Sequence, residues 1–227
     1  MPSFTDVMRT RRSAREFLPD PMPGDAIREV LEDARWAPSH SNTQPWIAHV
    51  VSGAARDRLS AALVAAHDAG RRTPDFSDTY GDGVHVERSR QQAARLYGVR
   101  GIAREDHEGR TEVVRENLRF YGAPHVVMLF IPRLGDGVRA ASDLGMYAQN
   151  FLLSLHARGY QGIAQAVHAQ YAQTVRTVLD VPADLKLLFG IAFGSAVADS
   201  PLRDIRVGRV PLSENVAVHD TAGLCVR

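Results

Sequence analysis

Hydrophobic residues along the chain fall into short apolar runs separated by stretches with helical periodicity. The apolar runs predict strands, because short runs rich in Val, Ile and Phe between turn formers favour extended structure. The run His125–Ile131 (HVVMLFI) is continuous, which is typical of a central strand buried on both faces. The expected strands cover residues 46–52, 125–131, 160–167 and 187–194.

The helical stretches place apolar side chains three and four residues apart. The first begins at Ser3, which forms a capping-box pattern with Asp6, and it runs into a cluster of arginines. In the longest, residues 138–158, Leu144 and Phe151 belong to a wide apolar stripe that is typical of a helix in a core or a subunit interface. The other expected helices run from about residue 25 to Pro38 and over 54–69, 87–97, 104–121 and 171–179.

Helices and a few strands that do not alternate strictly predict one α+β domain over residues 1–227. Two regions lack apolar periodicity. Residues 70–86 are rich in turn formers and predict a long exposed excursion. The chain from residue 198 onward loses its pattern but keeps Arg203, Arg206 and Arg209. If this tail is ordered, we expect it to wrap around something, since it has no core of its own.

Composition narrows the class of protein mainly by exclusion. The 227 residues carry a net charge of +1, so no basic field favours nucleic acid or an anionic membrane. A single cysteine, Cys225, excludes an internal disulfide and a multi-cysteine metal site. No apolar run approaches membrane-spanning length and no signal core is evident, so we expect a soluble, cytoplasmic protein that does not bind a membrane.

Two polar clusters are the candidates for chemistry. In the first, Arg11–Phe17 (RRSAREF), Arg11 and Arg15 share a face if the segment stays helical, and their guanidinium groups beside Ser13 suit a phosphate or another anion. The second, Ala37–Trp46 (APSHSNTQPW), is a stiff loop with polar side chains between two prolines. Each also has a simpler interpretation, a solvated basic helix end and a plain helix-to-strand connection.

Hydrolase and nucleotide-binding motifs are absent. The chain has no G-x-S-x-G elbow, no Walker loop and no H-E-x-x-H pair, and we expect no metal site. Its lone histidines, such as His107 and His168, are more simply structural or solvated. A serine or cysteine hydrolase is therefore poorly supported.

The two clusters together resemble the FMN-dependent nitroreductase family. The resemblance rests on Arg-x-Ser-x-Arg-x-Phe at 11–17 followed by A-P-S-x-x-N-x-Q-P-W at 37–46. The stretch 159–166, the FGIAFG strand and the arginine-bearing tail are similar as well, whereas residues 70–120 match loosely. The resemblance implies a nitroreductase-like α+β fold, a central mixed or antiparallel sheet flanked by helices, in an intertwined homodimer. Residues 70–122 would then form a variable substrate-pocket or lid excursion, and residues 198–227 an arm wrapping the partner subunit.

The same resemblance implies FMN at the subunit interface and NADPH or NADH as co-substrate. Arg11, Arg12 and Ser13 would hold the phosphate and ribityl end, and Arg15 would lie near flavin N1 and O2, where a cation stabilises the charge of the reduced ring. Gln165 and Ala166 would present backbone groups near N5 and O4. Arg206, or else Arg203 or Arg209, would complete the phosphate clamp, and the partner subunit's loop would supply Pro38, Ser39, His40 and Asn42.

Walls of the substrate pocket are predicted at Tyr97, Phe120 and Tyr121, although aromatic residues at helical spacing are often core. The resemblance implies a ping-pong reaction in which NAD(P)H reduces the flavin and a nitroaromatic, quinone or similar small-molecule acceptor reoxidises it. No side-chain acid or base is needed for hydride transfer. Alternatives are reductive dehalogenation, flavin fragmentation, a flavin-binding storage or regulatory module without turnover, and an anion-binding structural dimer.

Overall fold

The computed structural model of the protein describes residues 2–77, 81–205 and 207–219. Its centre is a sheet of four strands, β1 (Ile47–Ser52), β2 (His125–Pro132), β3 (Gln161–Gln165) and β4 (Leu185–Gly194). The spatial order is β1-β2-β4-β3, and every neighbouring pair is antiparallel. The predicted strands are thus all present, and of the two sheet types expected it is the antiparallel one.

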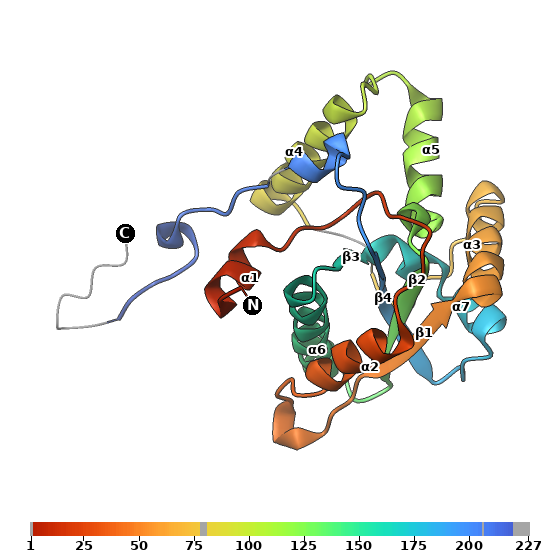
Figure 1. The fold of residues 1–227 in the computed structure, drawn as a ribbon. Helices are drawn as coiled ribbons and strands as arrows, with labels where there is room; N and C mark the ends of the chain where they lie inside the picture. Colours follow the sequence, from red (N-terminus) through yellow and green to blue (C-terminus); the bar gives the residue numbers. More distant parts are fainter. Residues whose placement is uncertain (1, 78–80, 206, 220–227) are drawn as a thin grey trace.

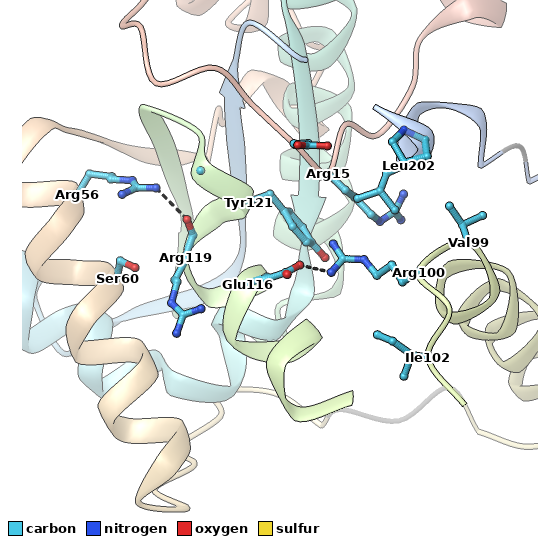
Figure 2. A pocket seen from close by; sticks show the side chains of 13 residues that line it. Arg15, Arg56, Ser60, Val99, Arg100, Ile102, Glu116, Arg119, Tyr121 and Leu202 are labelled. Atoms are coloured by element: carbon cyan, nitrogen blue, oxygen red, sulfur yellow. Dashed lines mark hydrogen bonds and ion pairs between the residues drawn. The ribbon is translucent and has the colours of Figure 1, made fainter. Parts of the chain in front are cut away.

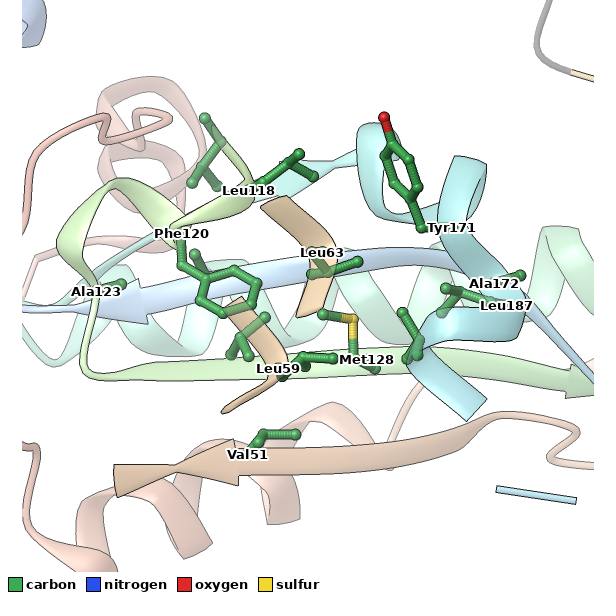
Figure 3. Packing of buried hydrophobic residues seen from close by; sticks show 14 of the residues in the cluster. Val51, Leu59, Leu63, Leu118, Phe120, Ala123, Met128, Tyr171, Ala172 and Leu187 are labelled. Carbon is green, nitrogen blue, oxygen red and sulfur yellow. The ribbon is translucent and has the colours of Figure 1, made fainter. Parts of the chain in front are cut away.

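Helices cover both faces of the sheet (Figure 1). Side chains of β2 alternate between the two resulting cores, with Met128 on one side and Leu129 on the other. The Met128 core contains residues of α3 (Gly53–Asp68), α5 (His107–Leu118) and α7 (Ala172–Leu179), as Figure 3 shows in part. The Leu129 core contains residues of α2 (Gly24–Ala34) and α6 (Val138–Ala157). Because β2 faces a core on each side, its apolar run is buried as predicted, and the α+β class is confirmed.

The arginine cluster differs from the helical interpretation. Helix α1 (Phe4–Thr10) has the predicted Ser3–Asp6 capping box but ends before Arg11, so Arg11 and Arg15 do not share a helix face. The chain instead runs alongside the sheet, where Ser13 bridges Gly162 of β3. Farther along, Phe17 bridges Ala196 just after β4. Backbone pairing with β3 and with the chain just after β4 takes the place of the helix and holds this segment in position.

The excursion between α3 and β2 is mostly helical. After a loop, α4 (Gly83–Val99) begins four residues earlier than residue 87, and α5 follows. Within the described residues α4 has no buried side chain. The start of the loop is anchored by Asp75, whose carboxylate accepts hydrogen bonds from Arg176 at 2.5 Å and from the backbone N–H of Leu187 at 2.8 Å.

The C-terminal arm leaves the body of the molecule after the short helix η4 (Pro201–Asp204) (Figure 1). An ion pair between Arg88 of α4 and Glu214 of η5 (Leu212–Glu214) ties the arm to the excursion at 2.9 Å. The arm exposes Val207, Leu212, Val216 and Val218. Among the described residues, no helix is both long and apolar enough to cross a lipid bilayer.

Candidate functional site

Two cavities meet at the arginine segment. The first, which we name the Ser13 cavity, has a volume of about 290 Å³ and lies where the ends of α1 and α6, the start of β3 and the chain after β4 come together. The second, the Tyr121 cavity, has a volume of about 710 Å³ and opens between the arginine segment, α3, α5 and η4 (Figure 2). Arg15 and Glu16 line both cavities. The polar lining of the Ser13 cavity includes Thr10, Arg12, Ser13, Arg15, Glu16, His156, Gln161, Ser200 and Arg203.

The Ser13 cavity is suited to an anion. No described side chain provides a carboxylate partner within 4 Å for Arg12, Arg15 or Arg203, although three guanidinium groups line this space. Burial, together with the nearby charge of Arg209, lowers the pKa of Arg11. A negatively charged ligand would relieve this accumulation of positive charge, and guanidinium groups match phosphate geometry. Of the tail arginines, Arg203 lines the cavity and Arg209 lies near Arg11, while Arg206 is outside the described residues.

The Tyr121 cavity contains an aromatic wall flanked by charge. Figure 2 shows the Tyr121 ring between Arg15 and the ion pair formed by Arg100 with Glu116. Burial raises the pKa of the Tyr121 phenol, and the charges of Arg15 and Arg100 offset part of that effect. The hydroxyl is therefore protonated at neutral pH and can serve as a hydrogen-bond donor. Val99, Ile102 and Leu202 add apolar surface to the same cavity.

Backbone strain is concentrated in two of the segments nominated from the sequence. Six described residues other than glycine have positive φ, and five of them are Ser41, Asn42, Gln44, Phe120 and Tyr121. This left-handed region is costly for side chains with a Cβ, most of all for aromatic ones, and such strain clusters at functional sites. The strain supports a functional role for loop 38–45 and for the turn that carries Tyr121.

Loop 38–45 does not reach either cavity within the chain. Pro38 and Asn42 line a separate surface hollow beside Trp36, and neither Ser39 nor His40 borders the Ser13 or Tyr121 cavity. Helix α6 anchors the loop, because the buried carboxylate of Asp143 accepts a hydrogen bond from the backbone N–H of His40. Within one chain, this half of the predicted site therefore lies away from the arginines of the Ser13 cavity.

Gln165 and Ala166 stand at the end of β3. The Gln165 side chain is buried and fully engaged, since its amide donates to the backbone and side-chain oxygens of Asn117 and its oxygen accepts from the N–H of Ala192. Only its backbone remains for a ligand, as the resemblance implies, and Ala166 is exposed. Sequence reasoning did not select Asn117, and no motif marks it.

The three predicted substrate-pocket aromatics lie in different environments. Only Tyr121 lines a cavity with Arg15. Phe120 has no exposed surface and packs in the Met128 core. Tyr97 lies on α4 with the guanidinium of Arg110 over its ring, outside both cavities. No group of three or more His, Cys, Asp or Glu among the described residues is arranged to hold a metal ion.

Comparison with known proteins identifies the class of protein to which this fold and these motifs belong. The nitroreductase family model matches residues 8–195, and the chain belongs to this family, as predicted from the two motifs.

Individual relatives match over most of the chain. It is 46% identical to the nitroreductase NfnB of Mycolicibacterium smegmatis over 210 residues, which cover 92% of this chain and 89% of that protein. It is 31% identical to a 4-nitrobenzoate reductase of Pseudomonas putida over 210 residues, 91% of each chain. The crystal structure of the FMN-dependent nitroreductase NfnB from Mycobacterium smegmatis in complex with NADPH superposes with a TM-score of 0.91 at 44% identity, covering 95% of this chain and 97% of that one.

Proposed function

We propose that the protein is an FMN-dependent oxidoreductase that uses NADPH or NADH to reduce nitroaromatic, quinone or similar electron-poor acceptors. The observation that carries the proposal is the junction at Arg15, where a small arginine-lined cavity opens beside a larger cavity with an aromatic wall. FMN requires both features, an anion site for its phosphate and an adjoining space above its ring. Two of the relatives, a nitroreductase in complex with NADPH and a 4-nitrobenzoate reductase, agree with this chemistry.

The residues present fit FMN. Arg11, Arg12 and Ser13, with Arg203 or Arg209 from the tail, would hold its phosphate, and the lack of carboxylate partners at Arg12 and Arg203 among the described side chains leaves these cations available. Arg206 stays a candidate for the same clamp. When bound, the flavin supplies the hydride-carrying chemistry, so the chain needs no acid–base pair of its own.

The chain's contribution to catalysis is then positioning and electrostatics. Arg15 holds a positive charge at the boundary of the two cavities, where it would stabilise the negative charge of the reduced ring. Tyr121, with the apolar residues around it, shapes a space in which nicotinamide and acceptor bind in turn. Backbone groups of Gln165 and Ala166 would orient the ring from the end of β3. A ping-pong sequence follows, because one space serves both substrates.

We further propose that the active form is a homodimer in which loop 38–45 completes the flavin site of the partner subunit. In this protomer Trp36, beside the loop, is 79% exposed and Phe4 of α1 is 69% exposed. Among the described residues no side chain of α4 is buried, and the arm projects away from the body with apolar residues exposed (Figure 1). Large exposed apolar surfaces of this kind mark interfaces. Residues 70–122 would act as the substrate-pocket excursion, residues 198–227 as the arm around the partner, and the cytoplasm is the expected location.

A visible absorption spectrum of the purified protein tests the flavin directly. We expect a yellow protein, bleached by NADPH without oxygen and recoloured by 4-nitrobenzoate or a quinone. Protein that stays colourless after incubation with FMN would end the proposal, and NADPH oxidation with no acceptor dependence would reduce it to a binding module.

For the dimer, coexpression of Asn42→Ala with Arg203→Ala should retain more FMN than either variant alone, because each heterodimer regains one intact site. Equal retention would contradict a shared site.

A further inference from the structure

Three side chains from different elements form a hydrogen-bonded chain along one wall of the Ser13 cavity. Thr10 is the last residue of α1, His156 lies near the end of α6, and Gln161 opens β3. The Thr10 hydroxyl oxygen lies 2.8 Å from Nε2 of His156, and the Gln161 amide nitrogen lies 2.9 Å from its Nδ1. Thr10 and His156 lie outside the sequence motifs described above, Gln161 belongs to the stretch 159–166, and all three line the cavity.

The direction of each hydrogen bond in this chain is determined by its neighbours. The Thr10 hydroxyl donates its only hydrogen to the backbone oxygen of Asp6 at 2.6 Å, so it must accept from His156. Nε2 of His156 therefore carries a hydrogen. Burial, and then the charge of Arg11, lower the pKa of His156; the hydrogen bond with Gln161 opposes this and the charge of Arg12 adds to it. Because the net direction is downward, the ring is neutral at neutral pH, and Nδ1 is an acceptor.

This arrangement determines which end of the Gln161 amide is free. Since Nδ1 accepts, Gln161 must present its NH₂ group to the histidine and turn its Oε1 away. Within the part of the chain that the structure describes, Oε1 is buried and has no hydrogen-bond partner. A buried carbonyl oxygen without a donor is costly, so this atom calls for a donor from outside the chain.

We propose that Gln161 binds a hydroxyl group of the ribityl chain of FMN through Oε1, and that His156 and Thr10 are positioning residues that hold its amide in the accepting orientation. The inference rests on the proposed FMN binding. Arginines suited to an anion line the cavity, and so does Gln161, whose Oε1 has no partner among the described residues, a combination that suits a polyol phosphate. The isoalloxazine ring has no hydroxyl group, so Gln161 would contact the ribityl chain of FMN and not its ring.

Dissociation constants of the dimeric apoprotein for FMN, riboflavin and lumiflavin, measured by quenching of flavin fluorescence, test the assignment. Gln161→Leu should weaken FMN and riboflavin about fivefold to tenfold, the usual effect of one hydrogen bond, and leave lumiflavin, which lacks the ribityl chain, unchanged. Gln173→Leu, an exposed glutamine on α7 outside the cavity, is the matched control and should change none of the three.

Two further variants distinguish the loss of this hydrogen bond from a folding defect. Gln161→Glu retains an acceptor oxygen but loses the donor to Nδ1, so it should recover part of the riboflavin affinity lost in Gln161→Leu. His156→Phe frees the amide to rotate and should weaken riboflavin by a smaller factor than Gln161→Leu. Equal weakening of lumiflavin, or unchanged riboflavin binding in Gln161→Leu, would overturn the inference and leave Oε1 to an ordered water. Failure of the wild type to bind any flavin would instead overturn the proposed function.

Discussion

The carboxylate of Asp143 accepts a hydrogen bond of 3.1 Å from the backbone N–H of His40. Asp143 lies on α6 and is only 4% exposed, whereas His40 belongs to the strained loop 38–45. Arg139, one turn earlier on α6, donates to Nε2 of His40 at 3.1 Å. The longest helix of the core thus fixes the position and the ring of a loop residue that sequence motifs assign to the cofactor.

Replacing Asp143 therefore tests whether the loop must be held for the flavin to bind. In Asp143→Ala the His40 N–H loses its acceptor, at a cost of about 1–3 kcal/mol, and FMN should bind roughly tenfold more weakly. Asp143→Asn keeps an acceptor oxygen and should bind FMN nearly as well as the wild type. Fluorescence titration of the purified protein measures both affinities, and undiminished affinity in Asp143→Ala would separate the loop from the cofactor.

Arg15 is expected to act on the rate of flavin reduction more than on flavin retention. Arg15→Ala removes the charge at the boundary of the two cavities, so reduction by NADPH should slow by roughly 10²-fold while FMN remains bound. Arg15→Lys should recover part of the rate. Stopped-flow measurement at the flavin absorbance follows this step, and wild-type kinetics in Arg15→Ala would remove Arg15 from the proposed role.

The tail arginines can be separated through the phosphate group. Arg203 lines the Ser13 cavity, so Arg203→Ala should weaken FMN about tenfold and leave riboflavin, which lacks the phosphate, unaffected. Arg58→Ala, at an exposed position on α3, is a matched control for loss of charge. If Arg203→Ala binds FMN normally, the same comparison in Arg206→Ala and Arg209→Ala identifies the clamp.

Acid should destabilise the fold through its buried histidines. Burial lowers the pKa of His168 to about 4, with a small opposing effect from the Asn117 backbone, while an unfolded histidine titrates near 6.5. Between these values only the unfolded state is protonated, so stability is complete above about pH 6.5 and falls as the pH drops, by roughly 3 kcal/mol in total for this residue. Urea midpoints from pH 7 to 4 measure the slope. His168→Gln should have a shallower slope, whatever its stability at neutral pH.

The anchor of the excursion gives a separate prediction on stability. Asp75 and Arg176 are each 11% exposed, so removing one leaves the other charge buried without its partner. Asp75→Ala should lower the free energy of unfolding by about 3 kcal/mol, and adding Arg176→Met should restore part of the loss. Urea unfolding of both variants at neutral pH provides the values. Additive losses in the double variant would show that the pair is not coupled.

Much of the secondary structure follows from the sequence because each element is set by local pattern. The run over 125–131 is buried on both faces as its continuous apolar composition indicates, and the 138–158 stripe forms α6. The end of α1 at Thr10 was not predictable in this way. The segment beyond it pairs with β3 and with the chain after β4, about 150 to 180 residues away, and such long-range backbone pairing overrides a local helical tendency.

The candidate site was likewise predictable from the sequence only in part. The sequence by itself determined the family, since the residue types at 11–17 and 37–46 and their spacing occur together. Only the tertiary structure decided which residues meet: Arg203 and Ser13 share a cavity, Phe120 lies in the core, and loop 38–45 lies apart from the arginines.

The hydrogen-bonded series Thr10, His156 and Gln161 can also be recognised only in the tertiary structure. Its members come from two helices and a strand, so no spacing in the sequence relates them. The free oxygen of Gln161 is defined by the direction of each hydrogen bond, and a hydrogen bond exists only once donor and acceptor lie within about 3 Å.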